Sequence, residues 1–305
     1  MKKEIVNIPA SIHQRLLNLA HSTNQLYNEL LYIYANERFL YRLSISPYQS
    51  KFILKGAMAI LNMAFEHPRY TRDIDLLGFT DNSEENVVGT IREICEIDVK
   101  EDGLTFDLDS IWGEPIKERD EYSGVRVRFD AFLGDRRIPN LQVDIGIGDS
   151  VYPRPKDEVY QGLLDLPKAH LRIYPVEAIL AEKIHALEKH GYLNSRMKDI
   201  YDIWYIASNQ KINGEILKKA LQSTFTNRQT QFPESLVIFE KDYVDQRRIT
   251  FWKAIGKKLY ENKDLPELES VLERLSSFLI PILNALFQDK EFDLIWDPSK
   301  NWSWD

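Results

Sequence analysis

The sequence has one cysteine, no excess of positive charge and no long unbroken apolar run, and each shortage excludes a class of protein. Cys95 cannot form an internal disulfide, so we expect a reduced, cytoplasmic protein. We interpret Cys95 as a small apolar residue on a helix over residues 91–97 rather than as a nucleophile. The net charge of −8 gives no bulk attraction to nucleic acid, so any RNA contact requires a local basic patch.

Features that would lead the chain to a membrane are also missing from the sequence. Residues 1–5 have neither the long apolar core nor the small-residue cleavage site of a signal peptide. The most apolar stretch, residues 278–287, is broken by Pro281 and Asn284 and is too short to span a bilayer. We therefore expect no membrane partner. With 44% apolar and 28% charged residues, the 305-residue chain has the composition of a globular protein of one or two domains.

The spacing of apolar residues predicts an α+β fold with its strands in the first half. Residues 10–43 have the period of two helices, and a loop follows at 44–48. Alternating apolar and polar residues predict strands, and later periodic stretches predict helices. The expected strands are 104–108, 124–133 and 136–147, and the expected helices are 86–97, 176–187, 197–207, 214–225, 245–259 and 267–287. We accordingly divide the chain into an N-terminal helical segment (1–50), a core (51–165) and a helical C-terminal domain (166–305).

Asp73 and Asp75 are the first candidates for chemistry. They alternate with Ile74 and Leu76, so a strand would project both carboxylates from one face. Two adjacent negative charges are costly unless a cation neutralises them, and hard oxygen ligands suit Mg²⁺ or Mn²⁺. A pair of solvated carboxylates at a strand end is the simpler alternative. The pattern therefore predicts a metal site but does not establish one.

Two further features lie on either side of this pair in the sequence. Gly56-Ala57 follows a short apolar run and begins a helix, and such a turn exposes N–H groups that can hold a triphosphate. Asp144 lies inside the apolar stretch 141–147, where an unpaired carboxylate is expensive to bury. A third metal ligand would explain Asp144. The alternative is an ion pair with Arg128 or Arg136 on a neighbouring strand.

A lysine and two acids occupy the predicted helices of the second half. Lys183 shares a helical face with Ile179 and Leu187, so it is expected to point inward, where it would hold phosphates or extend its ammonium group back to solvent. Asp199 and Asp202 lie three residues apart on one face of the following helix. Acids near a helix N-terminus are common, so these two indicate little by themselves.

Taken in order, these stretches resemble the AbiEii family, nucleotidyltransferase toxins of type IV toxin–antitoxin and phage-defence systems that are related to the MenT toxins. The resemblance covers about residues 51–204. One departure is Ala57, where the family usually has serine or glycine, so a side-chain contact to phosphate is lost while backbone donation is retained. The matching stretches are Lys55-Gly56-Ala57, Arg69-Tyr70-Thr71-Arg72-Asp73-Ile74-Asp75, Glu182-Lys183-Ile184-His185 and Arg196-Met197-Lys198-Asp199-Ile200-Tyr201-Asp202.

The resemblance implies a fold, an activity and roles for individual residues. It implies a polymerase-β-like nucleotidyltransferase core in which Asp73 and Asp75 bind metal and Lys183 contacts the phosphates of the nucleoside triphosphate (NTP) substrate. Asp199 would be a further active-site acid, and Asp144 would be the third carboxylate. Gly56, Ala57, Lys183 and Asp202 would bind the nucleotide.

The expected reaction is transfer of a nucleoside monophosphate from NTP to an RNA acceptor, with inhibition of growth as its consequence. Because related toxins modify the 3′ end of tRNA, tRNA is the leading acceptor, and a cognate antitoxin would act indirectly. Two alternatives stay open: nucleotide transfer to a Ser, Thr or Tyr hydroxyl of a protein, and a non-catalytic module that holds GTP or an antitoxin. The candidates for a local basic surface are Arg69, Arg72, Arg126, Arg128, Lys189 and Lys198.

Overall fold

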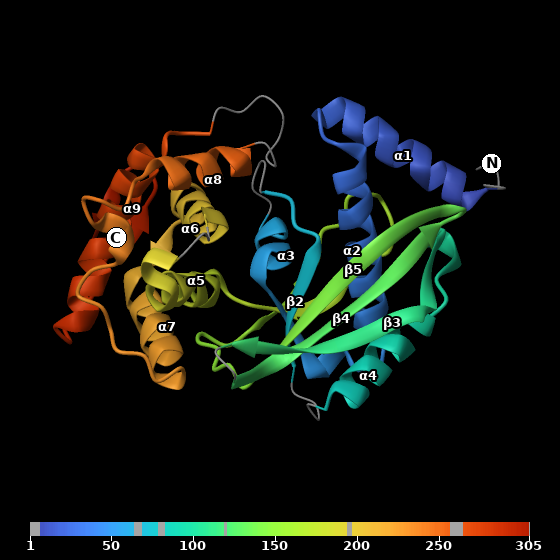
Figure 1. Cartoon of the computed structure of the whole chain (residues 1–305), viewed down its shortest axis with the longest axis horizontal. Coiled ribbons are helices and arrows are strands. Elements are labelled where there is room, and N and C mark those ends of the chain that lie inside the picture. Colours follow the sequence, from blue (N-terminus) through green and yellow to red (C-terminus); the bar gives the residue numbers. More distant parts are fainter. Residues whose placement is uncertain are drawn as a thin grey trace. The chain divides into compact units, whose positions relative to one another are not determined.

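The computed structural model describes residues 7–63, 69–78, 83–118, 121–193, 197–256 and 265–304 (Figure 1). The chain forms two compact units. Unit 1 consists of Met1–Ala64, Arg69–Gly148 and Lys156–Ile173. Unit 2 consists of Phe65–Pro68, Asp149–Pro155 and Tyr174–Asp305.

Unit 1 is built on a mixed sheet in which the described strands have the order β3-β4-β5-β2-β1-β7-β6. The β2/β5 and β1/β7 pairs are parallel, and the remaining pairs are antiparallel. Apolar residues of the central strands, such as Ile74, Val127 and Val143, are buried. The α+β class expected from the sequence is confirmed. The strands are β1 (Phe52–Lys55), β2 (Asp73–Gly78), β3 (Leu104–Glu118), β4 (Glu121–Leu133), β5 (Arg136–Ile147), β6 (Lys156–Val159) and β7 (His170–Ile173).

Two helices of unit 1, α1 and α4, begin at side chains that cap them. The Asn7 side chain accepts a hydrogen bond from Ala10 N at the start of α1, and Ser83 does the same for Asn86 N at the start of α4. Asn24, with a φ of 54°, ends α1 in the left-handed conformation that asparagine tolerates. The helices are α1 (Ile8–Thr23), α2 (Tyr27–Ile45), α3 (Gly56–Leu61) and α4 (Glu84–Glu96).

Helix α2 is longer than the sequence predicts and carries charge into the core. It runs to Ile45 rather than ending before Ser44, because Leu40 and Leu43 continue its buried stripe and the Ser44 hydroxyl bonds to the Tyr41 carbonyl within the helix. Two buried arginines of α2 bind one buried carboxylate: Arg38 Nε lies 3.0 Å and Arg42 Nη1 2.6 Å from Asp102 Oδ2. This ion cluster attaches the loop before β3 to α2.

Unit 2 is mostly helical, as expected for the C-terminal part. Its longest helix is α9. Within the described residues, α9 alone is long and apolar enough to cross a membrane, although half of its most apolar window is buried in the protein. It continues through Pro281, as the helix predicted over residues 267–287 requires. The predicted helix 245–259 is observed to residue 256, and residues 257–259 lie outside the described ranges. The elements are α5 (Val176–His190), α6 (Met197–Asn209), α7 (Gly214–Asn227), α8 (Gln246–Gly256), α9 (Leu268–Phe287) and a small sheet of β8 (Ile212–Asn213), β9 (Ile295–Asp297) and β10 (Asn301–Ser303).

Candidate active site

Strand β2 presents the two aspartates as the sequence predicts. Asp73 and Asp75 are half-buried, whereas Ile74 between them is buried, so the two carboxylates lie on the same face of the strand. β2 pairs with β1 on one side and with β5 on the other, which places Asp75 opposite Lys55 and opposite Asp144. The central position of β2 fixes the backbone of both aspartates.

Gly56 lies directly against the Asp75 carboxylate. A Cβ built on Gly56 would overlap Oδ2 of Asp75 and would lie 2.7 Å from its Cγ. The φ of Gly56 is +65°, a conformation that L-residues rarely adopt. The strand-to-helix junction from β1 to α3 therefore has two separate requirements for glycine. Ala57, the second residue of α3, is buried.

Asp144 is held by a bidentate ion pair with Arg126 of the neighbouring strand β4. Arg126 Nε lies 2.8 Å from Oδ1 and Nη2 lies 2.7 Å from Oδ2, and Gln142 donates a third hydrogen bond of 3.2 Å to Oδ2. The hydrogen bond to Asp144 raises the pKa of the Arg126 guanidinium, and the Asp73 carboxylate acts in the same direction. An ion pair was one of the two explanations for Asp144, but the expected partner was Arg128 or Arg136 rather than Arg126. Arg128 instead pairs with Glu114 at 2.5 Å.

In unit 2, Lys183 of α5 connects two acids of α6. Its Nζ lies 3.0 Å from Asp199 Oδ1 and 2.6 Å from Asp202 Oδ2. The side chain of Asp202 is 2% exposed and that of Asp199 is 14% exposed. Lys183 points inward, as its helical position predicts. The spacing of Asp199 and Asp202, which is uninformative by itself, places both carboxylates around one ammonium group.

The two aspartates of β2 provide ligand atoms that suit a divalent cation. Asp73 and Asp75 offer carboxylate oxygens, the donors that Mg²⁺ and Mn²⁺ prefer, and the Asp75 carboxylate occupies the position that a Cβ at residue 56 would take. Within the described residues, no group of three or more His, Cys, Asp or Glu side chains is arranged to hold a metal ion. The residues that fit a cation are thus Asp73 and Asp75, while both oxygens of Asp144 accept hydrogen bonds from Arg126.

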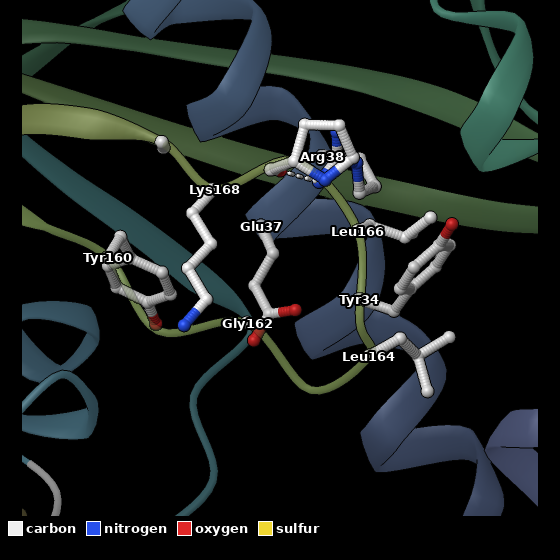
Figure 2. Close-up of a pocket in the computed structure, with 10 residues that line it drawn as sticks. Tyr34, Glu37, Arg38, Tyr160, Gly162, Leu164, Leu166 and Lys168 are labelled. Atoms are coloured by element: carbon white, nitrogen blue, oxygen red, sulfur yellow. Dashed lines mark hydrogen bonds between the residues drawn. The ribbon is translucent and has the colours of Figure 1, made fainter.

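A small cavity in unit 1 involves none of the predicted site residues. It lies between α2 and the segment 160–169, and its lining includes Glu37, Arg38, Tyr160 and Lys168 (Figure 2). Glu37 is buried and accepts a hydrogen bond of 3.0 Å from Leu163 N. Burial of Glu37 could not be predicted from the sequence, because an acid in an amphipathic helix is usually exposed. Cys95 is buried on α4, and burial raises the pKa of its thiol, as its interpretation as a core residue requires.

Comparison with known proteins identifies the class of enzyme. A family described as nucleotidyl transferase AbiEii toxin, type IV TA system, matches residues 38–274. The chain is therefore a nucleotidyltransferase. More narrowly, it belongs to the AbiEii family of type IV toxins. No curated protein sequence matches it.

Several solved structures are similar to the chain at low sequence identity. JHP933 from Helicobacter pylori has a TM-score of 0.45 and 16% identity, covering 84% of this chain and 92% of its own. MenT4, a nucleotidyltransferase toxin from Mycobacterium tuberculosis, has a TM-score of 0.46 and 13% identity, covering 93% and 99%. The antibiotic-resistance factor ANT(2'')-Ia has a TM-score of 0.36 and 15% identity, covering 64% and 94%.

Proposed function

We propose that this toxin transfers a nucleoside monophosphate from NTP to a hydroxyl of an RNA, with the 3′ end of tRNA as the leading acceptor. The observation that carries the proposal is the Asp75 carboxylate lying against Gly56, beside Asp73 on the same face of β2. Glycine is required there by both space and backbone angle, so the junction keeps the carboxylate beside the first turn of α3. A purely structural pair of solvated acids would not need such a close fit.

The proposed reaction balances as a substitution at the α-phosphorus. A bond forms between the acceptor oxygen and the α-phosphorus, the bond from that phosphorus to the bridging oxygen breaks, and pyrophosphate leaves with the electron pair. Asp73 and Asp75 would hold divalent cations, Mg²⁺ or Mn²⁺, which when bound neutralise the triphosphate and lower the pKa of the attacking hydroxyl. The acceptor proton passes to a carboxylate of the pair or to solvent.

Residues around the pair would position the substrate. Backbone N–H groups at Gly56 and Ala57 would donate to phosphate oxygens, a role that survives the absence of a hydroxyl at residue 57. Arg126 holds the Asp144 carboxylate through two hydrogen bonds, so Asp144 would act as a third ligand only after exchanging arginine for a cation.

Unit 2 carries a further candidate for a phosphate contact, Lys183 with its two acids. We propose that Lys183 contacts the NTP phosphates and that Asp199 and Asp202 hold its ammonium group in place. The two ion pairs of 3.0 and 2.6 Å support this, because they restrict a side chain that has four rotatable bonds. A phosphate group would exchange with the more exposed Asp199 rather than with the buried Asp202.

A labelling experiment tests the proposed acceptor. The purified protein is incubated with Mg²⁺ and each of the four NTPs labelled at the α-phosphate, with total RNA in one reaction and a protein lysate in another. We expect label in the RNA, lost on nuclease digestion, and none with Asp73→Asn or Asp75→Asn. Label confined to protein would favour Ser, Thr or Tyr modification. Undiminished growth inhibition by both variants would favour a non-catalytic module that holds GTP or the antitoxin.

A further inference from the structure

Two arginines of unit 1 lie over tyrosine rings on the same helix. The Arg72 guanidinium lies 4.4 Å from the centre of the Tyr32 ring, and that of Arg136 lies 4.6 Å from the centre of the Tyr27 ring. Both tyrosines belong to α2, five residues apart, which corresponds to about 7.5 Å along the helix. We call Tyr27, Tyr32, Arg72 and Arg136 the arginine–tyrosine strip.

Hydrogen bonds from the strip to its surroundings hold it in place. Tyr32 OH donates to the Pro139 carbonyl at 2.8 Å, which connects α2 to the N-terminal part of β5. Arg136 Nη2 donates to Asn28 Oδ1 at 3.0 Å. Side-chain order is therefore established before any ligand arrives, which lowers the entropic cost of binding.

The arginines nevertheless remain accessible. The side chain of Arg72 is 53% exposed, and Arg136 is exposed as well. Each guanidinium has one face on a tyrosine ring, and the exposure of both arginines leaves part of each group open to a ligand. An exposed, oriented guanidinium plane beside an aromatic ring is the arrangement on which unstacked RNA bases stack, while its N–H groups bind phosphate.

One end of the strip is joined to the candidate active site. Arg72 directly precedes Asp73, and Asn36 of α2 donates a hydrogen bond of 3.2 Å to the Arg72 carbonyl. From Tyr27 to Tyr32 the helix advances by about 7.5 Å, so the strip has the length of a short single-stranded segment. A strand bound at Arg72 would therefore lie near the start of β2.

We propose that the arginine–tyrosine strip binds a single-stranded segment of the RNA acceptor and directs its end toward Asp73 and Asp75. This inference rests on the proposed function and adds a surface to it. Arg72 and Arg136 supply local positive charge for a polyanion on a protein whose net charge is −8. Duplex RNA fits less well, because its bases are already stacked on each other.

Glu29 provides a test in which a substitution should strengthen RNA binding instead of weakening it. Its carboxylate pairs with Arg72 at 2.8 Å and is 22% exposed, so the pair is near the surface and contributes little to stability. An RNA phosphate would replace Glu29 as the partner of Arg72. Glu29→Gln removes a charge that repels RNA while retaining a group that accepts a hydrogen bond, so it should strengthen RNA binding.

Fluorescence anisotropy of a labelled single-stranded RNA of about 12 nucleotides measures the binding without NTP or metal. We expect Arg72→Ala/Arg136→Ala to weaken binding at least about tenfold and to reduce the salt dependence by about 0.7 per arginine. Glu29→Gln should bind about two- to threefold more tightly. The matched control is Lys51→Ala/Lys100→Ala, which removes the same charge from exposed positions outside the strip and should leave the affinity within about twofold.

The possible outcomes test RNA binding by the arginine–tyrosine strip independently of the proposed transfer reaction. Loss of affinity in the arginine variant alone, with the opposite change in Glu29→Gln, supports the proposal. Equal losses in the lysine control, unchanged binding by the arginine variant, or a preference for an acidic peptide over the RNA would overturn it. If Asp75→Asn abolishes label transfer to RNA while the arginine variant binds normally, the proposed reaction stands and the strip is wrong. In the transfer assay, the arginine variant should raise KM for RNA and retain kcat.

Discussion

Replacing Glu37 with glutamine tests how burial of a carboxyl group makes stability depend on pH. Glu37 lies on α2 facing the cavity shown in Figure 2 and is 6% exposed. Burial raises its pKa from 4.5 to about 8, against smaller opposing effects from the Leu163 N–H and the Arg38 guanidinium. The folded protein thus retains a proton on Glu37 across a range in which the unfolded chain has lost it.

The sign and size of the effect follow from proton linkage. Between pH 4.5 and about 8 the unfolded state binds fewer protons at this residue, so the free energy of unfolding falls as pH rises. The slope is about 1.4 kcal/mol per pH unit, and the Glu37 contribution is fully present below pH 4.5 and lost as pH rises through 8. Over the whole window the loss is on the order of 5 kcal/mol.

Glutamine resembles the protonated acid and can still accept the hydrogen bond from Leu163 N. We therefore expect Glu37→Gln and the wild type to have similar stability near pH 5, with the variant several kcal/mol more stable near pH 8. Urea unfolding followed by circular dichroism across this range measures the difference. Glu101→Gln, which changes the same charge at an exposed position, is the control. A difference between Glu37→Gln and the wild type that stays constant with pH would refute the reasoning.

Three further substitutions test other parts of the account. Gly56→Ala should lower transfer by about a hundredfold, because the new Cβ displaces the Asp75 carboxylate; a kcat within about threefold of wild type would contradict this. Lys183→Ala should cost about 3–5 kcal/mol of stability by removing the ion pair of buried Asp202, and Lys183→Met/Asp202→Asn should recover most of it in thermal melts without restoring activity. Asp102→Ala should also lower the free energy of unfolding by about 3–5 kcal/mol, measured by urea unfolding, because Arg38 and Arg42 lose their shared partner. A loss below about 1 kcal/mol would show that solvent replaces the carboxylate.

Local patterns in the sequence were enough to predict the elements that carry the candidate site. The period-two alternation around Asp73 and Asp75 predicted their common face on β2, and the helical spacing of Lys183 predicted that it points inward. Both predictions depend only on the geometry of one element, which is why they could be made without knowing the neighbours.

The sequence alone does not predict which residues of neighbouring strands lie opposite each other, and Asp144 shows why. If the hairpin between β4 and β5 continued without interruption from Leu133↔Arg136, Val125 would lie opposite Asp144. An irregularity between Phe129 and Ala131 shifts the register by one residue and brings Arg126 opposite Asp144 instead. Asp130 accepts a hydrogen bond from Asn140 N there, at 2.8 Å, and Asn140 has a positive φ of 55°. A one-residue change of this kind decides which arginine becomes the partner.

The central claim is that Asp73 and Asp75 act together on the nucleotide, and single-turnover transfer measures it most directly. Label from the preferred NTP is followed into RNA with wild type, Asp73→Asn and Asp75→Asn at saturating Mg²⁺, with folding verified by circular dichroism. We expect each variant to stay folded and to lose at least about a hundredfold in rate, equivalent to about 2.7 kcal/mol of transition-state stabilisation. A folded Asp75→Asn variant that transfers label at the wild-type rate would contradict it.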